Sequence, residues 1–169
     1  MVTDIDKRAK NTLILSLGGN VGNVTTSFAK AIAKINQEIG EVVLTSSVYQ
    51  TKAWGHEAQA DFFNQVIQVE TVKKPVQCLQ LILEIETSLG RLRTGDKWRE
   101  RIIDIDILFY NQEQIDEPHL KIPHPYIHQR NFILTPLAEI CAEYIHPVLH
   151  KSIAVLEQTS MDKLKVVKI

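Results

Sequence analysis

Apolar and polar positions alternate along this chain in a way that predicts short strands and two amphipathic helices. Residues 12–17 form a β-rich apolar run, and residues 18–23 supply turn residues ending in Asn23, a good helix N-cap. Apolar residues at helical spacing then predict a helix over residues 24–39, with Gly40 where a C-terminal glycine belongs. The N-terminal part is therefore expected to fold as strand, turn and helix.

The middle of the chain continues this alternation. Residues 41–50 and 61–71 have the pattern of strands, and residues 51–60 form a long connection between them. Pro75 occupies a favourable first-turn position for a second helix, whose apolar face ends before Gly90. Two strands and a helix are therefore expected here.

A strong last strand is predicted over residues 102–110, after a polar, basic loop at residues 90–101. The resulting order β-α-β-β-α-β is typical of an α+β, ferredoxin-like core, with an antiparallel sheet and helices packed on it. Residues beyond 111 form a C-terminal extension that we expect to pack back on this core. We expect a flexible tail at residues 1–11 and a single domain at residues 12–169.

Composition narrows the functional classes. The 169 residues are 44% hydrophobic, and 19 Lys plus Arg face 20 Asp plus Glu, so the net charge of -1 favours neither nucleic acid nor an anionic membrane. No apolar run has the length of a membrane span or the form of a signal peptide, which predicts a cytoplasmic protein. Cys78 and Cys141 are expected to be buried free thiols, and the histidine spacing argues against zinc.

Two aspartates in the last strand are the leading candidates for chemistry. Strand alternation puts Asp104 and Asp106 on one face, with Cα atoms about 6.6 Å apart, and puts Ile103, Ile107 and Phe109 on the other. Magnesium accepts one or two carboxylates together with phosphate oxygens and water, so the pair is a suitable half-site. The alternative is that both carboxylates simply face water on an edge strand.

The loop before this strand adds positive charge. Residues 91–101 contain five basic and two acidic side chains, and arginine forks suit phosphate oxygens. Following the chain through the predicted topology brings this loop, the turn at residues 18–23 and the connection at residues 51–60 to one rim of the sheet. We therefore expect either polyphosphate binding at this rim or, as the alternative, a structural ion pair between Arg101 and Asp104.

Aromatic residues offer a place for a flat heterocycle. Ring stacking with edge hydrogen bonds is a common recognition scheme, although most aromatic residues belong to the core. The candidates for such a slot are Trp54, Phe62, Asn64, Trp98 and Phe132. His124, held between two prolines, is interpreted by itself as part of a structural turn.

Together these segments resemble the 6-hydroxymethyl-7,8-dihydropterin pyrophosphokinase family, from about Leu13 to Ile140. The strongest match runs from Gly90-Arg91-Leu92-Arg93 through Lys97-Trp98 to the stretch at residues 101–107. Supporting motifs lie at residues 15–22, residues 46–49, Pro123-His124-Pro125 and Arg130-Asn131-Phe132. Ala53 and Arg99-Glu100 depart from the family pattern, in the loops that would close over the substrates.

The resemblance implies transfer of pyrophosphate from MgATP to the hydroxymethyl group of 6-hydroxymethyl-7,8-dihydropterin, with AMP as the other product. It implies that Asp104 and Asp106 bind two Mg²⁺ ions and that Arg91 and Arg101 stabilise charge during transfer. The implied ATP contacts are Glu86, Arg93, Trp98, Arg101, Ile107, His124 and Arg130. The implied pterin contacts are Thr51, Trp54, Phe62, Asn64, Trp98 and Phe132, with the two phenylalanines stacked on opposite faces.

We therefore expect a monomeric enzyme of small-molecule substrates in folate biosynthesis, without nucleic-acid or membrane partners. Two rivals use the same residue types. A two-metal phosphodiesterase or nuclease also needs paired carboxylates, though usually with more acidic ligands than this rim offers. A non-catalytic ferredoxin-like binding module, for example one for RNA, would stack bases on sheet aromatics.

Overall fold

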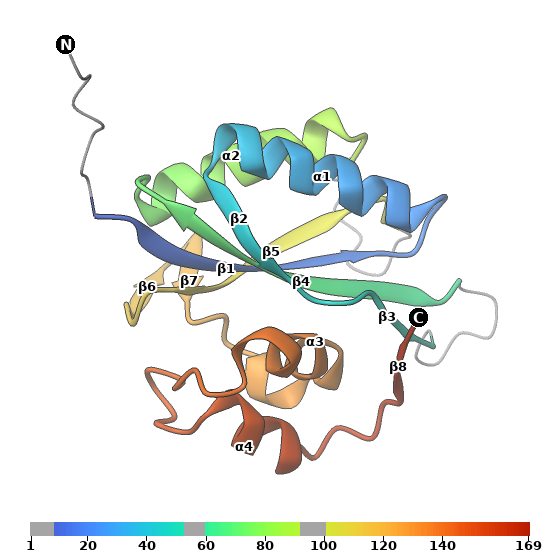
Figure 1. The fold of residues 1–169 in the computed structure, drawn as a ribbon, viewed down its shortest axis with the longest axis vertical. Helices are drawn as coiled ribbons and strands as arrows, with labels where there is room; N and C mark the ends of the chain where they lie inside the picture. Colours follow the sequence, from blue (N-terminus) through green and yellow to red (C-terminus); the bar gives the residue numbers. More distant parts are fainter. Residues whose placement is uncertain (1–8, 53–59, 92–100) are drawn as a thin grey trace.

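The computed structural model describes residues 9–52, 60–91 and 101–169, and the core elements follow the predicted order (Figure 1). These elements are β1 (Asn11–Gly19), α1 (Val24–Glu38), β2 (Glu41–Thr45), β3 (Tyr49–Thr51), β4 (Phe62–Thr71), α2 (Pro75–Ser88) and β5 (Asp104–Tyr110). Asn23 caps α1 as predicted, because its Oδ1 accepts a hydrogen bond from Thr26 N at 3.0 Å. Pro75 lies in the first turn of α2.

The sheet has the antiparallel ferredoxin-like arrangement that the sequence predicted. Its strand order is β5-β1-β4-β3-β8, where β8 (Val166–Lys168) comes from the C-terminal end of the chain, and β2 also pairs with β4. The predicted strand at residues 41–50 is divided into β2 and β3 because Ser46 breaks the ladder between them. Ser46 Oγ accepts the hydrogen bond from Val66 N at 2.9 Å, while Ser46 N donates to Val66 O at 2.8 Å.

Both faces of the sheet are covered. Helices α1 and α2 lie on one face, and the C-terminal helices lie on the other (Figure 1). The first core packs Leu13, Leu15 and Leu17 of β1 against apolar residues of α1 and α2. The second core packs Ile14 and Val66 against Ile133, Leu134 and other C-terminal residues. Strand β1 therefore supplies apolar side chains to both cores.

The alternation predicted for the last strand is correct only as far as Ile107. A β-bulge in β5 lies opposite Ile14 and Leu15, which pair with Phe109 and Ile107 respectively. The extra residue turns Phe109 to the opposite face, where it joins Leu108 in the second core. The expectation that Phe109 shares a face with Ile107 is therefore wrong.

The residues beyond 111 pack back on the core, as predicted. They comprise β6 (Ile115–Glu117), β7 (Leu120–Ile122), the 3-10 helix η1 (Ile127–Gln129), α3 (Asn131–Cys141), α4 (Ile153–Gln158) and β8 (Val166–Lys168). Strand β8 pairs with β3 and so extends the sheet. Glu139 of α3 accepts hydrogen bonds from Ser47 N, Ser47 Oγ, Tyr49 Oη and Lys168 Nζ, which ties α3 to this edge.

Gly40 is required by a close approach between the end of α1 and β4. A Cβ atom at this position would lie 2.2 Å from Glu70 O and 3.0 Å from the Thr71 Cα. Because both neighbours are backbone atoms, no side chain at position 40 can be accommodated without moving β4. Gly40 follows the end of α1 as predicted, and the close approach of the β4 backbone explains why a glycine stands there.

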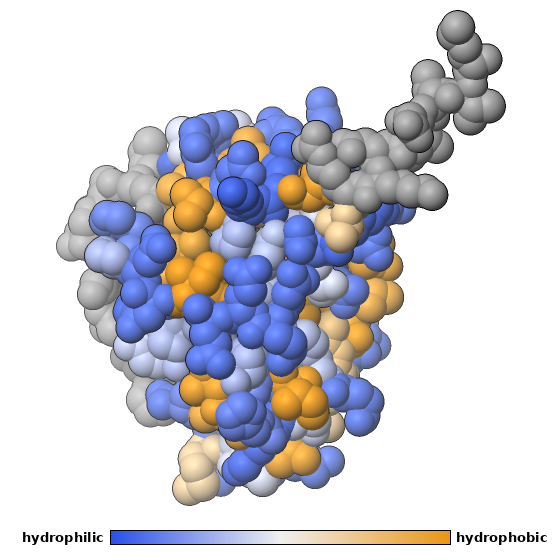
Figure 2. All heavy atoms as spheres, turned by 90° about the vertical axis from the view of Figure 1, so that its left-hand side faces the viewer, coloured by the Kyte–Doolittle hydropathy of each residue, from blue (hydrophilic) through white to orange (hydrophobic). Residues whose placement is uncertain are grey.

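The surface and the helices show how apolar residues are distributed outside the two cores. On the face drawn in Figure 2, apolar side chains form separate groups divided by polar ones.

None of the helices within residues 9–52, 60–91 and 101–169 combines the length and the apolar character needed to cross a membrane. Cys78 is buried, Cys141 is half-buried, and both are free thiols.

His146 makes the stability of the C-terminal extension depend on pH. Its Nδ1 accepts hydrogen bonds from Val148 N and Leu149 N, both at 3.2 Å, and its ring meets Phe109 edge-on. Burial, with smaller contributions from His128 and His150, lowers the pKa of His146 from 6.5 to about 4. The folded protein therefore holds this imidazole in its neutral form at neutral pH.

We expect the free energy of unfolding to fall as the pH drops from about 6.5 to about 4. In that window the unfolded chain binds a proton at His146 that the folded chain does not. Urea unfolding at a series of pH values checks this, with His146→Asn as the comparison because an amide oxygen can still accept a hydrogen bond. The variant should show a smaller loss on acidification, and equal losses would contradict the assignment.

Candidate active site

Three of the four predicted catalytic residues, Arg101, Asp104 and Asp106, meet in a cleft of about 170 Å³ at one end of the sheet, and the fourth, Arg91, pairs with Asp104. The end of β1 and the starts of β4, β5 and α3 form its walls. Its lining residues are Ser16, Gly18, Gly19, Phe62, Asn64, Arg101, Asp104, Asp106, Arg130, Phe132 and Ile133. The two aspartates, two arginines, two phenylalanines and the asparagine were all predicted from the sequence to belong to one site.

The glycine-rich turn fits closely against the strand that carries the aspartates. Asn20 N donates to Arg101 O at 2.9 Å, and Asn20 Oδ1 accepts from Arg101 N at 2.8 Å. A Cβ atom on Gly19 would lie 2.8 Å from Ile102 O, a backbone atom that cannot move aside cheaply. The predicted meeting of the turn with the end of the basic loop is therefore present, and glycine allows it.

Asp104 forms ion pairs with both arginines that the family resemblance assigns to catalysis. Arg91 and Arg101 each place a guanidinium nitrogen against its carboxylate. Strand β5 is an edge strand of the sheet, but the Asp104 side chain is only 19% exposed. The structure thus contains the ion pair that was the alternative for Arg101, and Asp104 is not a simple solvent-facing carboxylate.

Asp106 lies in a less favourable electrostatic environment. Burial, together with the carboxylates of Asp104 and Glu86, raises the pKa of Asp106 to about 6, and the guanidinium groups of Arg91 and Arg130 oppose the shift. An ionised carboxylate that is poorly solvated costs free energy unless a cation or hydrogen bonds compensate it. The ionised Asp106 carboxylate therefore does not stabilise the fold by itself, and a bound cation would offset its cost.

Glu86 connects α2 to the catalytic strand. It is 1% exposed, and its Oε1 accepts a hydrogen bond from Ile105 N at 2.7 Å. The same carboxylate forms an ion pair with Arg91, which also contacts Asp104. Arg91 therefore holds one carboxylate from the helix and one from the strand, and this arrangement fixes the guanidinium beside the cleft.

Arg130 and His124 lie on the side of the cleft formed by the C-terminal extension. The Arg130 guanidinium carbon lies 4.9 Å from the centre of the Tyr126 ring and 5.8 Å from that of Phe132. Burial and the charge of Arg130 lower the pKa of His124 to about 4, although Asp104 opposes the shift. His124 Nδ1 accepts a hydrogen bond from Tyr126 N at 3.2 Å, so its ring is held in a defined turn.

The remaining predicted residues lie outside the lining of the cleft or outside the described residues. Thr51 is buried in β3, opposite Phe62 in the strand register. The Ile107 side chain is in the first core, on the face of β5 that packs under α1 and α2. Arg93, Trp54 and Trp98, with the departures at residues 53 and 99–100, belong to ranges that the structure does not describe.

Two lining residues were missed by the sequence argument, Ser16 and Ile133, while Gly18 and Gly19 were expected at the rim as part of the turn but were not named as lining residues. Ser16 pairs with Asp106, and Gly18 pairs with Asp104, so β1 lies directly beside the carboxylates. A signal was present, because Ser16 is a polar residue within the apolar run of the first strand. Strand alternation continued from Ser16 would have brought Gly18 to the same face.

The residues of the cleft fit a magnesium ion held jointly with a polyphosphate. Asp104 and Asp106 offer carboxylate oxygens from alternate positions of one strand, and the pKa of Asp106 indicates a need for positive charge. Within the part of the chain that the structure describes, no cluster of three or more His, Cys, Asp or Glu side chains is placed to hold a metal. Two carboxylates on one strand are a number typical of Mg²⁺ sites that share phosphate oxygens.

Comparison with known proteins agrees with this geometry. Residues 14–142 match the 7,8-dihydro-6-hydroxymethylpterin-pyrophosphokinase (HPPK) family. The 2-amino-4-hydroxy-6-hydroxymethyldihydropteridine pyrophosphokinase of Aquifex aeolicus is 42% identical over 140 residues, which are 83% of this chain and 86% of that protein. The enzyme of the same description from Bacillus subtilis is 39% identical over 134 residues, 79% of this chain and 80% of that one.

A solved structure shares the fold. The crystal structure of wild-type Plasmodium falciparum HPPK-DHPS superposes with a TM-score of 0.72 at 20% identity, over 90% of this chain. The matched region is 45% of that longer chain, so this chain spans less than half of it. The order of strands, the cleft at the end of the sheet and the sequence identities lead to one conclusion: the chain belongs to the HPPK family.

Proposed function

We propose that this cleft is where the chain carries out the reaction of its family, pyrophosphoryl transfer from ATP to hydroxymethyldihydropterin in folate biosynthesis. The observation that carries the assignment is the meeting of Asp104 and Asp106 with Arg101 and Arg130 in one cleft. Carboxylates that attract a cation and arginines that attract phosphate are the two halves of a MgATP site. The chain is a pyrophosphokinase, and the proposal concerns which residues perform the reaction.

In this reaction the hydroxymethyl oxygen of the pterin attacks the β-phosphorus of ATP. A new oxygen–phosphorus bond forms, and the bond from the β-phosphorus to the oxygen bridging it to the α-phosphorus breaks, so that AMP leaves with that oxygen. The hydroxyl proton is released. Because no covalent enzyme intermediate is needed, positioning and electrostatic stabilisation account for catalysis.

Two Mg²⁺ ions held by Asp104 and Asp106 belong to the proposal. When bound, Mg²⁺ neutralises phosphate charge and makes the hydroxyl proton easier to remove. Asp106 contributes a carboxylate whose pKa is raised by burial first and by the negative charges of Asp104 and Glu86 second. Asp104 contributes by being oriented through Arg91 and Arg101, so that both carboxylates face the cleft before substrates arrive.

The arginines have two partners available in the reaction cycle. Without nucleotide, Arg91 and Arg101 are paired with Asp104, which prevents several positive charges from repelling one another in a small volume. A polyphosphate chain entering the cleft offers further oxygens in the bidentate geometry that guanidinium groups prefer. We propose that both arginines share their donors with the phosphates and stabilise the charge of the transition state.

Substrate contacts follow the two sides of the cleft. Phe62 from β4 and Phe132 from α3 both line it, as two rings that stack on opposite faces of a pterin would have to do. Asn64 supplies an amide for the pterin edge, with Thr51, Trp54 and Trp98 as further contacts in the proposal. The proposed ATP contacts are Glu86, Arg93, Trp98, Arg101, His124, Arg130 and, through its backbone, Ile107.

Replacing Phe62 by alanine should mainly weaken pterin binding. Loss of one stacked ring is expected to raise the KM for the pterin about tenfold, with a smaller change in kcat. Phe63→Ala is the matched control, because Phe63 packs against the first core rather than lining the cleft. The control should lower the melting temperature without changing KM, and an unchanged KM in Phe62→Ala would remove Phe62 from the site.

A product assay tests the proposed function directly. The protein is incubated with magnesium, ATP and 6-hydroxymethyl-7,8-dihydropterin, and AMP is separated from ATP and ADP by ion-exchange chromatography. AMP should form only when the pterin is present, in equal amount to the pterin diphosphate. AMP formation without pterin would favour a phosphodiesterase, and no AMP under any condition would favour a binding module.

The described structure weighs against both rivals. A two-metal phosphodiesterase needs a larger set of acidic ligands, and among the described residues no group of three candidate ligands is present. An RNA-binding sheet needs an open face for base stacking, whereas helices cover both faces of this sheet (Figure 1). A monomeric state and a cytoplasmic location complete the proposal, and size-exclusion chromatography tests the former.

A further inference from the structure

Helix α3 receives its N-terminal cap from a distant part of the chain. The residue before the helix, Arg130, makes no side-chain cap hydrogen bond. Instead, Asp162 Oδ2 accepts a hydrogen bond from Asn131 N at 2.8 Å, and Asp162 O accepts one from Asn131 Nδ2 at 3.0 Å. A carboxylate at this position satisfies a free N–H group of the first turn and interacts favourably with the helix dipole.

The first turn of α3 has a particular need for this contact. Pro136 lies inside the helix and has no N–H to donate to the carbonyl oxygen of Phe132, four residues earlier. The helix has only 11 residues, and its first turn therefore loses an internal hydrogen bond as well as a local cap. External contacts must compensate, and Asp162 provides one where the helix begins.

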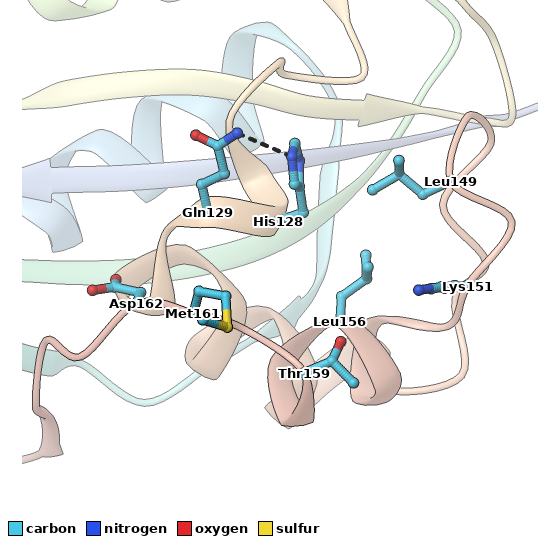
Figure 3. A pocket seen from close by; sticks show the side chains of 8 residues that line it. All are labelled: His128, Gln129, Leu149, Lys151, Leu156, Thr159, Met161 and Asp162. Carbon is cyan, nitrogen blue, oxygen red and sulfur yellow. Dashed lines mark hydrogen bonds between the residues drawn. The ribbon is translucent and has the colours of Figure 1, made fainter.

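Asp162 is itself held firmly enough to serve as an anchor. Its Oδ1 accepts a hydrogen bond from Leu164 N at 2.9 Å, and its own N donates to Ser160 Oγ at 3.2 Å. A hollow of about 730 Å³ lies between η1 and α4, and Met161 and Asp162 are part of its lining (Figure 3). The hollow separates η1 from α4, so these elements are not packed against each other there. The segment around Asp162 is therefore joined to the start of α3 by its hydrogen bonds to Asn131.

The residues on either side of Asn131 are Arg130 and Phe132, and both line the active-site cleft. A hydrogen bond to Asn131 N therefore fixes the backbone from which both side chains project. The same C-terminal segment continues to β8, where Val166 pairs with Thr51 of β3. One stretch of chain thus holds the start of α3, which is a wall of the cleft, and pairs with β3, the strand beside Phe62, without lining the cleft itself.

We infer that Asp162 is a positioning residue for substrate binding, acting through Asn131 on the pterin-stacking ring of Phe132 and on the guanidinium of Arg130. The inference rests on the proposed function for the roles of these two side chains. This inference divides the residues of the active site into two groups according to what they act on. The carboxylates and arginines of the sheet act on the phosphates being transferred, and the cap at Asp162 sets the pterin and nucleotide contacts supplied by the C-terminal extension.

Steady-state kinetics of Asp162→Ala test this role. Losing a helix cap is expected to raise the KM for hydroxymethyldihydropterin and for MgATP about fivefold each. The kcat should stay within about twofold, because the groups that act on the transferred phosphates lie on other elements. Asp162→Asn keeps one acceptor oxygen and should restore much of the affinity, and Lys163→Ala, at the exposed neighbouring position, should behave as wild type.

A purely structural role gives a different result. If Asp162→Ala merely lowers the folded fraction, apparent kcat falls and both KM values stay at the wild-type level, which overturns the inference. Amide hydrogen exchange by NMR adds a readout that does not depend on catalysis. Exchange at Asn131 and its neighbours should accelerate in Asp162→Ala but not in Lys163→Ala, and unchanged exchange also overturns the inference.

Failure of the inference and failure of the proposed function are distinguishable. A wild-type protein that forms no pterin-dependent AMP refutes the proposed function, whatever the variants do. A wild-type protein that forms AMP, with an Asp162→Ala variant of unchanged KM, refutes only the positioning role. Thermal unfolding of each variant sets the temperature for the assays, so that all of them are compared in the folded state.

Discussion

Asp106→Asn is expected to lower kcat by about a hundredfold or more while leaving the protein folded. The carboxylate faces the cleft, and its pKa of about 6 reflects burial beside Asp104 and Glu86. Removing it removes a proposed metal ligand together with an unfavourable buried charge. The free energy of unfolding should therefore stay equal to that of wild type or increase, a combination that distinguishes a functional carboxylate from a structural one.

The measurement is the rate of pterin-dependent AMP formation over a range of magnesium concentrations, paired with urea unfolding. Asp116→Asn is the matched control, because that carboxylate is 85% exposed and pairs with Lys121 in the β6-β7 hairpin. The control should retain wild-type turnover. Near-normal turnover in Asp106→Asn would refute the assigned role, and a large loss of stability would indicate that the carboxylate serves the fold instead.

Arg101→Ala is expected to lower kcat by about 10² to 10³, with a smaller rise in the KM for ATP. The guanidinium is paired with Asp104 without nucleotide, and its fork is proposed to stabilise the charge that develops on the transferred phosphates. Asp104 keeps Arg91 as a partner in the variant, so the folded state loses only part of the local compensation. The effect should therefore fall on turnover more than on stability.

Arg101→Lys sharpens this test because it keeps the charge and removes the planar fork. Partial recovery of kcat is expected, since a lysine acts as a point charge and cannot bind phosphate oxygens bidentately. Lys121→Ala, at an exposed cation paired with Asp116, is the control for loss of positive charge. Equal changes in kcat and KM for Arg101→Ala would mean that Arg101 binds the ground state and the transition state alike.

The arrangement of charges explains how so many ionised groups coexist in a small cleft. Arg91 lies between Glu86 of the helix and Asp104 of the strand, and Arg101 approaches Asp104 from the end of the basic loop. Each guanidinium compensates a carboxylate that burial would otherwise penalise. The exception is Asp106, whose pKa is raised by burial and by the nearby carboxylates of Asp104 and Glu86, and a cation at this position would offset that cost.

The topology and much of the cleft followed from the sequence because both depend on regular alternation. The placement of Asp104 and Asp106 on one face needed only the two-residue period of a strand. The likeness of the sequence motifs to a known family supplied the residues of other elements, such as Phe62, Arg130 and Phe132. Ser16 was not named, although it lies beside Asp106, because the first strand was interpreted only as an apolar run.

Two departures of strands from regular pairing were not predicted. Strand β5 contains a bulge that turns Phe109 to the opposite face, and Ser46 divides one predicted strand into β2 and β3. Both departures depend on hydrogen bonds with a partner strand distant in the sequence. A pattern within one segment does not contain the identity of its partner, so neither departure was predictable from period alone.

Local spacing along the chain was enough to predict the order of elements, the apolar faces of the helices and the strand that carries the two aspartates, because apolar side chains at a regular period must share one buried face. The ion pair between Arg101 and Asp104, three residues apart, was one of two alternatives for this loop, and the structure shows that it forms. Other contacts became known only from the fold: Arg91 also pairs with Asp104, Asn20 holds the backbone of Arg101, and Asp162 caps α3. These join residues that are distant in the sequence, and they exist only once folding has excluded water and brought the elements together.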